Sequence, residues 1–600
     1  MSKAPKDAAL GNRSLSQFDV CIIGSGAGGG TAAHVLTAGG KNVVVLETGP
    51  LTYEFLDDPK HDPVPLHSND ELKEAVRGWY DPVGDLQPRT FQTTGRPAQV
   101  NFDVNELPRV VGGGFGHADV KTPRFNKIDF TLKSTMEGLL ARTPGLSVPG
   151  FGADSPSANF ADWPFTYDEL EPFYTEIEQL YGVQGASVGA DANPYASTRS
   201  RPYPMPPGLP MYLALKLSDG CRKTSLFGRA LSPHAYPSTA ASQPYDGRPP
   251  CVDCGLCSGF GCPNRAKGAP AVVTLRKALL SGHCQLRYNA HVLSLKLAGS
   301  HVTGVRYVDA NGDLQTVTAD TFMLAASPIE SARLCLLSNV PSSSGQIGQN
   351  LMFHLQTNVN GFSPERIHGQ RGRAVTNGVA DFRGVEPGGE AVRVFQTPDG
   401  PQVWLGGVCE FGASQGLPIT EDGEVYALQA GIFRYGIRLK NALRDLALGQ
   451  HLYGLTMQAE DAPQRANQVA LDGTIKDVFG QPVAHVTYAN HPYELGARAF
   501  YRQYLVEVLT NSGAHDVFVA PRDILLGAPV SRHVMGTLRM GPDPATSVVD
   551  PRGKFHEVDN LYACDGSVFV TSSGWNPTLT LMAVSARIAH GIAGTPPTIT

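Results

Sequence analysis

A run of glycines near the start of the chain has the spacing that phosphate-binding loops use. Residues 24–29 read GSGAGG, which fits the pattern Gly-x-Gly-x-x-Gly. The apolar run FDVCII at 18–23 precedes the glycines and is typical of a buried parallel strand. The segment 30–40 has small and apolar residues at helical spacing and ends in two glycines, and a second apolar run, NVVVL, follows at 42–46. These segments predict a strand–helix–strand unit.

The glycines have separate physical roles in such a unit. Gly24 makes the tight turn, Gly26 lets the backbone approach a pyrophosphate, and Gly29 lets the helix pack closely against the strand. The helix N-terminus faces the phosphate charge, and Glu47, after the second strand, accepts hydrogen bonds from an adenosine ribose. We therefore predict a site for FAD or NAD rather than a glycine-rich turn in an unrelated α/β domain. The binding residues predicted in this unit are Gly24, Gly26, Ala27, Gly28, Gly29 and Glu47.

Four cysteines fall within twelve residues, at positions Cys251, Cys254, Cys257 and Cys262. Three interpretations are open. The spacing, followed by Pro263, resembles ferredoxin-like ligation of an iron–sulfur cluster, which would pass electrons from a flavin to an external carrier. A zinc site is a second interpretation, although the usual separated pairs of ligands are missing. The third is a structural loop rich in Cys and Gly with free thiols. The other six cysteines are predicted to be small buried residues: Cys21, Cys221, Cys284, Cys335, Cys409 and Cys564.

The composition limits the classes of protein that remain. A chain of 600 residues suggests two to four domains or one large enzyme with insertions, and 42% hydrophobic residues are enough for a substantial core. The net charge of −6 gives no reason to expect nucleic acid or an anionic membrane as a partner. The chain has no apolar stretch of about 18 residues, so we expect no membrane span. Residues 1–17 lack the apolar segment of a secretory signal, so we expect a cytoplasmic protein.

Polar residues recur at defined places near the end of the chain. The segment 531–541 reads SRHVMGTLRMG, and residues 560–563 predict a short strand that returns to the first sheet. The turn Asp565-Gly566 follows that strand, at the edge where open α/β sheets hold ligands. Residues 576–578 (NPT) open an apolar final helix, with Pro at a helix-start position.

With these motifs in view, the sequence resembles the glucose–methanol–choline (GMC) flavin oxidoreductase family. The matching elements are the glycine unit with Glu47, H-x-x-G-T-x-R-M-G at 533–541, and D-G-S and N-P-T-L-T at 565–567 and 576–580. Further matching segments are VGGGFGH at 111–117, TPRF at 122–125, SPIESARLCLLS at 327–338 and IGQNLMFH at 347–354. They cover both ends and the middle of the chain. The spacing from VGGGFGH to TPRF is most similar to the pyranose oxidase and gluconate dehydrogenase branches.

The resemblance implies FAD as the cofactor and a pair of catalytic residues. His533 corresponds to the family's base, and the histidine pKa near 6.5 suits removal of a hydroxyl proton. Asn576 corresponds to its partner, which holds the substrate oxygen against the flavin. The alternatives are a buried histidine and a helix-capping asparagine without catalytic roles. His556 and His590 match no motif and are predicted to be exposed.

The resemblance also implies further cofactor contacts. His117 is expected to touch FAD without a covalent bond, while a bond to the 8α-methyl group and a structural role are the alternatives. Similar Cys-Gly loops occur in relatives that need no cluster, so the structural loop is our interpretation of the four cysteines and no metal site is predicted. The remaining expected FAD contacts are Gly113, Val292, Asp565, Gly566, Pro577 and Thr578.

The expected fold is α/β, with a Rossmann-like FAD-binding domain and a discontinuous substrate domain built on a mostly antiparallel sheet. We predict 16–140, 221–355 and 531–600 for the FAD domain, 141–220 and 356–530 for the substrate domain, and a flexible segment at 1–15. The expected activity is FAD-dependent oxidation of an alcohol group, in a sugar, glycoside or polyol, with oxygen or an external carrier as electron acceptor. A lyase of the same fold and a flavin/iron–sulfur electron-relay subunit are the alternatives. The oligomeric state is left open.

Overall fold

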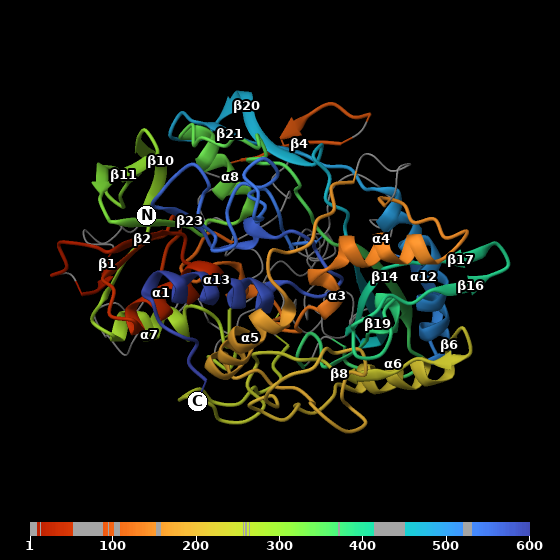
Figure 1. Ribbon diagram of the computed structural model, residues 1–600. Coiled ribbons are helices and arrows are strands. Elements are labelled where there is room, and N and C mark those ends of the chain that lie inside the picture. Colours follow the sequence, from red (N-terminus) through yellow and green to blue (C-terminus); the bar gives the residue numbers. More distant parts are fainter. Residues whose placement is uncertain are drawn as a thin grey trace, which may run out of the picture.

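The structure is a computed structural model. It describes residues 9–12, 14–51, 88–93, 95–100, 108–151, 158–255, 257, 261–262, 264–369, 372–412, 450–519 and 531–599. Elements far apart in the sequence share sheets throughout, so each half of the molecule draws on several parts of the chain (Figure 1).

The first half is built on a six-stranded sheet with the order β1-β9-β3-β2-β13-β23. The strands are β1 (Ala9–Gly11), β2 (Val20–Ile23), β3 (Val43–Leu46), β9 (Cys284–Arg287), β13 (Thr321–Leu324) and β23 (Leu561–Ala563). All neighbours pair in parallel except β1, which runs antiparallel to β9 at the edge. Every residue of β2 and β3 is buried, as expected for strands covered on both faces. The predicted return of the chain to this sheet near residue 560 is confirmed by β23.

Helices cover one face of this sheet. They are α1 (Ala27–Ala38), α5 (Tyr167–Tyr181), α7 (Thr274–Leu280) and α13 (Thr578–Ala593). Helix α1 packs against both α7 and α13, and α13 packs against α5. In Figure 1 these helices lie below the sheet, and the hairpin of β10 (His291–Ala298) and β11 (His301–Val308), extended by β12 (Leu314–Val317), lies above it.

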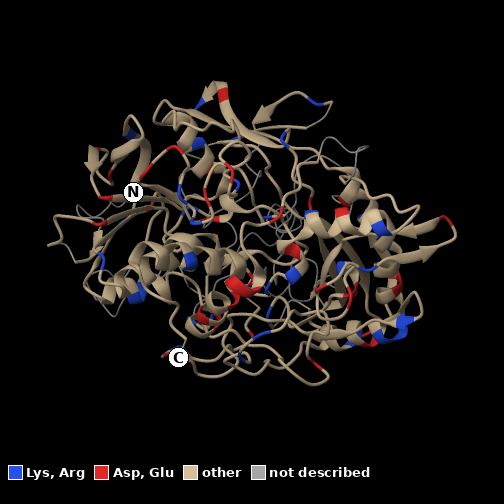
Figure 2. Ribbon diagram, in the orientation of Figure 1, with Lys and Arg blue, Asp and Glu red and all other residues tan. Residues whose placement is uncertain are grey.

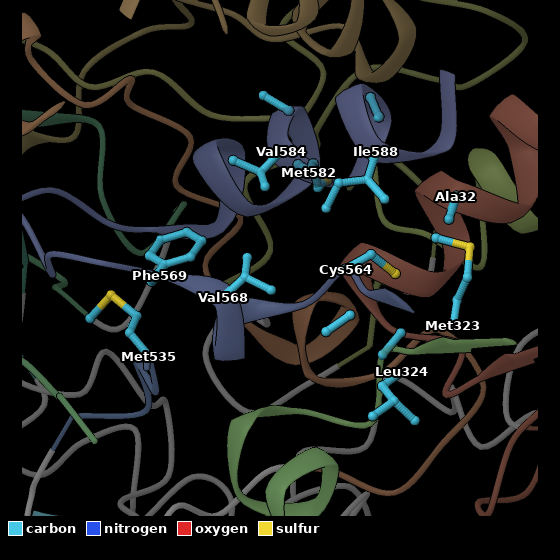
Figure 3. Close-up of a cluster of buried hydrophobic side chains, with 14 of the residues drawn as sticks. Ala32, Met323, Leu324, Met535, Cys564, Val568, Phe569, Met582, Val584 and Ile588 are labelled. Carbon is cyan, nitrogen blue, oxygen red and sulfur yellow. The ribbon is translucent and has the colours of Figure 1, made fainter. Parts of the chain in front are cut away.

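The core of this half lies between the sheet and the helices (Figure 3). Ala32 of α1 and Ile588 of α13 are buried with Met323 of β13. Cys564 follows β23 and is 1% exposed, which confirms the prediction of a small buried residue there. This packing fixes the N-terminal ends of α1 and α13 at the same edge of the sheet.

The second half is built on a six-stranded sheet with the order β22-β14-β19-β18-β15-β8, in which every neighbouring pair is antiparallel. Its strands are β8 (Pro233–Ala235), β14 (Leu355–Phe362), β15 (Asn377–Val379), β18 (Gly407–Gly412), β19 (Leu452–Ala459) and β22 (His515–Val519). Helices α6 (Tyr212–Lys223) and α12 (Pro492–Asn511) pack on this sheet. The mixed α/β fold with an antiparallel second sheet is as predicted. Strand β8 lies within the predicted FAD-domain piece 221–355, although it pairs in this second sheet.

Smaller elements complete the molecule. The four-stranded sheet β20-β21-β4-β5 contacts α8 (Pro328–Leu337), and its strands are β4 (Thr90–Gln92), β5 (Gln99–Val100), β20 (Gln468–Lys476) and β21 (Pro482–Thr487). Two hairpins are β6 (Ser225–Leu226) with β7 (Arg229–Ala230), and β16 (Phe395–Thr397) with β17 (Gly400–Gln402). Within the described ranges, the remaining helices are α3 (Lys127–Phe130) and α4 (Leu132–Arg142), with one-turn helices at Gly114–His117, Asp381–Arg383 and Gly566–Val568.

Charged residues of both signs are spread over the ribbon of both halves (Figure 2). Within the described ranges, none of the helices combines the length and apolar character that crossing a bilayer requires.

Candidate active site

The glycine loop between β2 and α1 has the geometry of a phosphate-binding turn. Gly24 has φ +101°, and a Cβ there would lie 2.3 Å from the carbonyl oxygen of Ala325. A Cβ on Gly29 would lie 2.0 Å from the carbonyl oxygen of Gly24, so α1 packs directly on the strand end. Gly26 is the N-cap of α1 and uses no side-chain cap, and the first turn of α1 carries no acidic residue. This helix end is therefore suited to an anion.

Glu47 follows β3 and is tied to the same loop. Its Oε2 accepts hydrogen bonds from Ser25 N at 3.0 Å and Ser25 Oγ at 2.6 Å, and its Oε1 accepts one from Gly49 N at 2.8 Å. Burial raises the pKa of Glu47, and these hydrogen bonds oppose the rise. The carboxyl group is thus held at the carboxyl end of the sheet beside the glycine loop.

One cavity brings most of the predicted residues together. It is lined by Gly24, Gly26, Ala27, Gly28, Glu47, Gly113, His117, Val292, His533, Asp565, Gly566, Pro577 and Thr578, while Gly29 and Asn576 do not line it. Glu330 also lines it, and it pairs with Arg89 at 2.9 Å. Burial would raise the pKa of Glu330, but Arg89 and Arg333 lower it to about 2. The cavity extends from the N-terminus of α1 and Glu47 to His533, and this extent suits an elongated dinucleotide.

The space in front of the glycine loop fits such a cofactor. A Cβ on Gly26 would meet only Gly113 Cα, at 3.9 Å, so the space in front of this glycine is open. A Cβ on Gly28 would instead lie 2.1 Å from the backbone oxygen of Cys564, so this glycine serves close packing of the chain itself. The loop therefore leaves room for a ligand at Gly26, where the motif predicts the pyrophosphate.

His533 lies beside a second histidine. Its Nδ1 is 2.8 Å from Nδ1 of His354, the residue that precedes β14, and the two rings are almost perpendicular at 83°. The other nitrogen of His354, Nε2, is 3.2 Å from the carbonyl oxygen of Ser572. A carbonyl oxygen only accepts, so His354 carries its proton on Nε2 and its Nδ1 accepts. His533 then donates from Nδ1, which leaves a lone pair on its Nε2.

Asn576 faces that lone pair. Its Nδ2 is 3.4 Å from His533 Nε2 and donates to Glu410 Oε1 at 2.8 Å, while its Oδ1 accepts from the hydroxyl of Tyr236 at 2.5 Å. Asn576 is 2% exposed. Because Glu410 accepts and Tyr236 donates, the amide has one orientation, with its N–H groups toward His533.

Glu410 also holds a lysine. Its Oε2 is 2.6 Å from Nζ of Lys121, which is 3.0 Å from Asp119 on the other side. Burial would lower the pKa of Lys121, but the two carboxylates raise it above its usual value. Burial, and then the neighbouring His354 and Lys121, hold the pKa of His533 well below 6.5. His533 is therefore neutral near neutral pH and can accept a proton at Nε2.

Sequence reasoning missed four of these residues. His354 belongs to the segment 347–354 that carried the family resemblance, and Lys121 lies between His117 and TPRF, so both had a signal. Tyr236 and Glu410 had none, because they reach Asn576 only through the pairing of the second sheet.

The prediction that His590 is exposed is wrong. It is 6% exposed, and its Nε2 lies 3.0 Å from Glu176, because α13 is packed between α1 and α5. His556 is partly buried rather than exposed, and its Nε2 lies 2.9 Å from Ser547 Oγ.

The segment of the four clustered cysteines is linked to the cavity lining through Cys257. Cys257 and Cys262 are buried, Cys251 is partly exposed and Cys254 is exposed. Lys267 Nζ donates to the carbonyl oxygens of Cys257, at 2.6 Å, and Ala118, at 2.9 Å, and so ties this loop to the cavity-lining segment. Among the described residues there is no group of three or more His, Cys, Asp or Glu that could hold a metal ion.

Comparison with known proteins defines the class. Family models described as GMC oxidoreductase match residues 164–356 and 463–585, more than half of the chain. The fold and the matched family are those of a flavin-dependent oxidoreductase. The chain belongs to the GMC oxidoreductases, as the sequence motifs indicated.

Similar proteins cover nearly the whole chain. It is 28% identical to 2-methyl-1,2-propanediol dehydrogenase of Mycolicibacterium austroafricanum, over 97% of this chain and 96% of that one. It is 26% identical to the gluconate 2-dehydrogenase flavoprotein of Pantoea cypripedii (96% and 94% covered) and to the fructose dehydrogenase large subunit of Gluconobacter japonicus (97% and 99%).

Solved structures show the same fold. Pyridoxine 4-oxidase from Mesorbium loti matches with a TM-score of 0.57 and 17% identity, over 96% of this chain and 99% of that one. A formate oxidase variant of Aspergillus oryzae matches with a TM-score of 0.57 and 14% identity, over 96% and 98%. The cofactor of this chain is FAD, and its activity is oxidation of CH–OH groups.

Proposed function

We propose that the protein oxidises one alcohol group of a sugar, glycoside or polyol to a carbonyl group, with His533 as the base and Asn576 as its partner. The observation that carries this proposal is the meeting of a histidine lone pair and an amide N–H. His533 Nε2 and Asn576 Nδ2 face each other at 3.4 Å. His354, oriented by the Ser572 carbonyl oxygen, accepts from His533 Nδ1, and Glu410 accepts from Asn576 Nδ2, so both side chains are held in this orientation.

These two groups treat an alcohol in complementary ways. His533 Nε2 accepts the hydroxyl proton, and the Asn576 N–H donates to the oxygen that is left. When bound, FAD supplies the acceptor for the hydride that leaves the same carbon. Burial keeps His533 neutral before the reaction, so its Nε2 is free of a proton when substrate arrives.

Different cavity residues contact different parts of the cofactor. Under this proposal the N-terminus of α1, with Gly24, Gly26, Ala27 and Gly28, holds the pyrophosphate, and Glu47 binds the adenosine ribose. Asp565 and Gly566 contact the pyrophosphate and ribityl chain, and Pro577 and Thr578 lie at the flavin. Gly113 and His117 contact the flavin side without a covalent bond, and Val292 lies near the adenine. Gly29 supports the turn by packing.

The substrate class is supported by relatives of full length. Their names describe dehydrogenases of 2-methyl-1,2-propanediol, gluconate and fructose, and a further relative, 27% identical, is named 6'''-hydroxyparomomycin C oxidase. Both dehydrogenases and oxidases are among them, so oxygen or an external carrier completes the cycle. The proposed substrate domain remains 141–220 and 356–530, and the FAD domain 16–140, 221–355 and 531–600. We also place the protein in the cytoplasm, because its ten free cysteines suit a reducing compartment.

Anaerobic titration of the purified flavoprotein with a panel of sugars, polyols and simple alcohols tests this function. Bleaching of the oxidised flavin bands by an alcohol, with formation of one carbonyl per flavin, is the expected result. A lyase would convert its substrate without net bleaching, and an electron-relay subunit would respond to reduced carriers but to no alcohol. His533→Ala and Asn576→Ala, with flavin content unchanged, should slow the bleaching by about 10²-fold or more.

A further inference from the structure

A partly buried lysine lies between two carboxylates beside the catalytic pair. Lys121 Nζ is 2.6 Å from Glu410 Oε2 and 3.0 Å from Asp119 Oδ2, and the exposed fractions of the three side chains are 14%, 4% and 17%. An ammonium group has three N–H donors. Among the described residues, these two carboxylates are the partners of Lys121 Nζ, so one donor is left for another acceptor.

This lysine reaches the reaction centre through one carboxylate. The two oxygens of Glu410 hold Lys121 Nζ and Asn576 Nδ2 respectively. The oxygens of a carboxylate are adjacent, so these two nitrogen donors lie side by side. On its other side, Asp119 follows Ala118, which lines the FAD cavity. Glu410 thus links the lysine to the amide that faces His533, while Ala118, one residue before Asp119, belongs to the lining of the FAD cavity.

The charges around Lys121 favour a neutral partner. The three charges, one positive and two negative, sum to −1, so a ligand carboxylate would be repelled, and a ligand ammonium has no acceptor for the remaining N–H donor of Lys121. A hydroxyl group suits the arrangement, because its oxygen accepts from the ammonium and its proton can be donated to a carboxylate.

We propose that Lys121 binds the hydroxyl group on the carbon next to the reacting alcohol, so that the preferred substrates are vicinal diols and polyols. Asn576 binds the reacting oxygen and Lys121 its neighbour, and Glu410 sets the spacing between the two donors. This proposal rests on the proposed function and deepens it. It assigns to Lys121 the selection of substrate, and to Asp119 and Glu410 the positioning of Lys121.

Three matched alcohols test this subsite in the wild-type holoenzyme: propane-1,2-diol, propan-1-ol and 2-aminopropan-1-ol. The kcat/KM for flavin reduction should be about 10²-fold higher with propane-1,2-diol than with propan-1-ol. The reason is that propan-1-ol leaves the remaining N–H donor of Lys121 without an acceptor. The charged amino alcohol should be the poorest of the three. Equal rates for diol and mono-alcohol would overturn the proposal and leave the alcohol oxidation itself standing. If a larger alcohol is the better substrate, the same comparison is made between that alcohol and its analogue without the neighbouring hydroxyl group.

Lys121→Met removes the donor with little change in length. It should reduce the ratio of diol to mono-alcohol rates by at least about tenfold, and Lys121→Arg should restore part of it. Lys216→Met is the matched control, because Lys216 on α6 also forms a 2.6 Å ion pair, with Glu365, and neither residue belongs to the cavity lining. An unchanged ratio in folded Lys121→Met overturns the proposal. If this variant does not fold, the wild-type ratios decide.

A binding measurement separates this proposal from the proposed function. If no alcohol bleaches the flavin, the proposed function is wrong. The shift in melting temperature of the holoenzyme with each of the three compounds then tests the subsite independently of turnover. Stabilisation by propane-1,2-diol that propan-1-ol does not give, and that Lys121→Met abolishes, supports the subsite. Equal stabilisation by both compounds rejects it.

Discussion

His354 and His533 meet through their Nδ1 atoms at 2.8 Å. One of the two nitrogens donates and the other accepts, and the Ser572 carbonyl oxygen at the far side of His354 decides which. Burial lowers the pKa of His354 to about 4, so this ring stays neutral and keeps one proton. A backbone carbonyl thus determines, through one imidazole, that the lone pair of His533 lies on the nitrogen that faces Asn576.

Replacement of His354 should test this control of the tautomer. His354→Leu removes the acceptor for His533 Nδ1–H, so His533 loses its preferred tautomer, and kcat for flavin reduction should fall by about 10²-fold with a smaller change in KM. His354→Asn retains an acceptor near the Nδ1 position and should recover a large part of the loss. Stopped-flow flavin reduction measures both variants. Equal damage from Leu and Asn would show that His354 only fills space.

The pH dependence of kcat/KM should reflect the lowered pKa of His533. The neutral histidine is the active base, so activity holds while pH falls from neutral through 6.5 and is lost only below it, as the ring becomes protonated. Lys121→Met removes one of the causes of the lowered pKa, so its acid limb should move to higher pH. Lys216→Met should leave the limb in place. An acid limb at or above 6.5 in the wild-type enzyme would contradict this account.

Local patterns in the sequence predicted the cofactor half well. The strand, glycine turn, helix and second strand are contiguous, so β2, α1 and β3 follow from spacing alone. The predicted strand at 560–563 was also correct, because its apolar residues precede a turn. His533 and Asn576, 43 residues apart, were selected by family motifs, and the structure brings them to 3.4 Å. Their catalytic roles remain predictions.

Long-range pairing explains what the sequence did not reveal. Tyr236 follows β8 and Glu410 lies in β18, and both reach Asn576 because β8, β15 and β18 are neighbours in one sheet. No local pattern records that order. The exposure predicted for His590 was wrong for the same reason, since Glu176, 414 residues away, lies on a helix that covers α13.

Glu410→Gln should show how much activity depends on the orientation of the Asn576 side chain, because this variant keeps Asn576 itself. The new amide can donate as well as accept, so Asn576 loses a fixed acceptor, and Lys121 loses a counter-charge. We expect kcat to fall by about tenfold or more with flavin content unchanged, and the preference for a neighbouring hydroxyl to weaken. Glu365→Gln, at the exposed partner of Lys216, is the control. Wild-type kcat in Glu410→Gln would remove this residue from the proposed mechanism.

Gly26 and Gly28, on either side of Ala27, should respond differently to the same added methyl group. Gly26 has φ −67°, which alanine adopts without strain, and its Cβ would have only Gly113 Cα nearby, at 3.9 Å. The fold should therefore tolerate Gly26→Ala, while the methyl group occupies space in the FAD cavity. The variant should purify with at least about tenfold less flavin, and its apoprotein should melt like the wild-type apoprotein.

Gly28→Ala should show the opposite order of effects. Its Cβ would lie 2.1 Å from the backbone oxygen of Cys564, so α1 and the segment after β23 must move apart, at a cost of about 1–3 kcal/mol or more. The Gly28→Ala apoprotein should therefore melt at a lower temperature than the wild-type apoprotein, independently of flavin binding. Gly591→Ala, exposed on α13 with nothing within 4 Å of the new Cβ, should change neither property for the worse. Full flavin content in Gly26→Ala would show that the cofactor does not approach the loop at this glycine, because the methyl group would then stand in unused space.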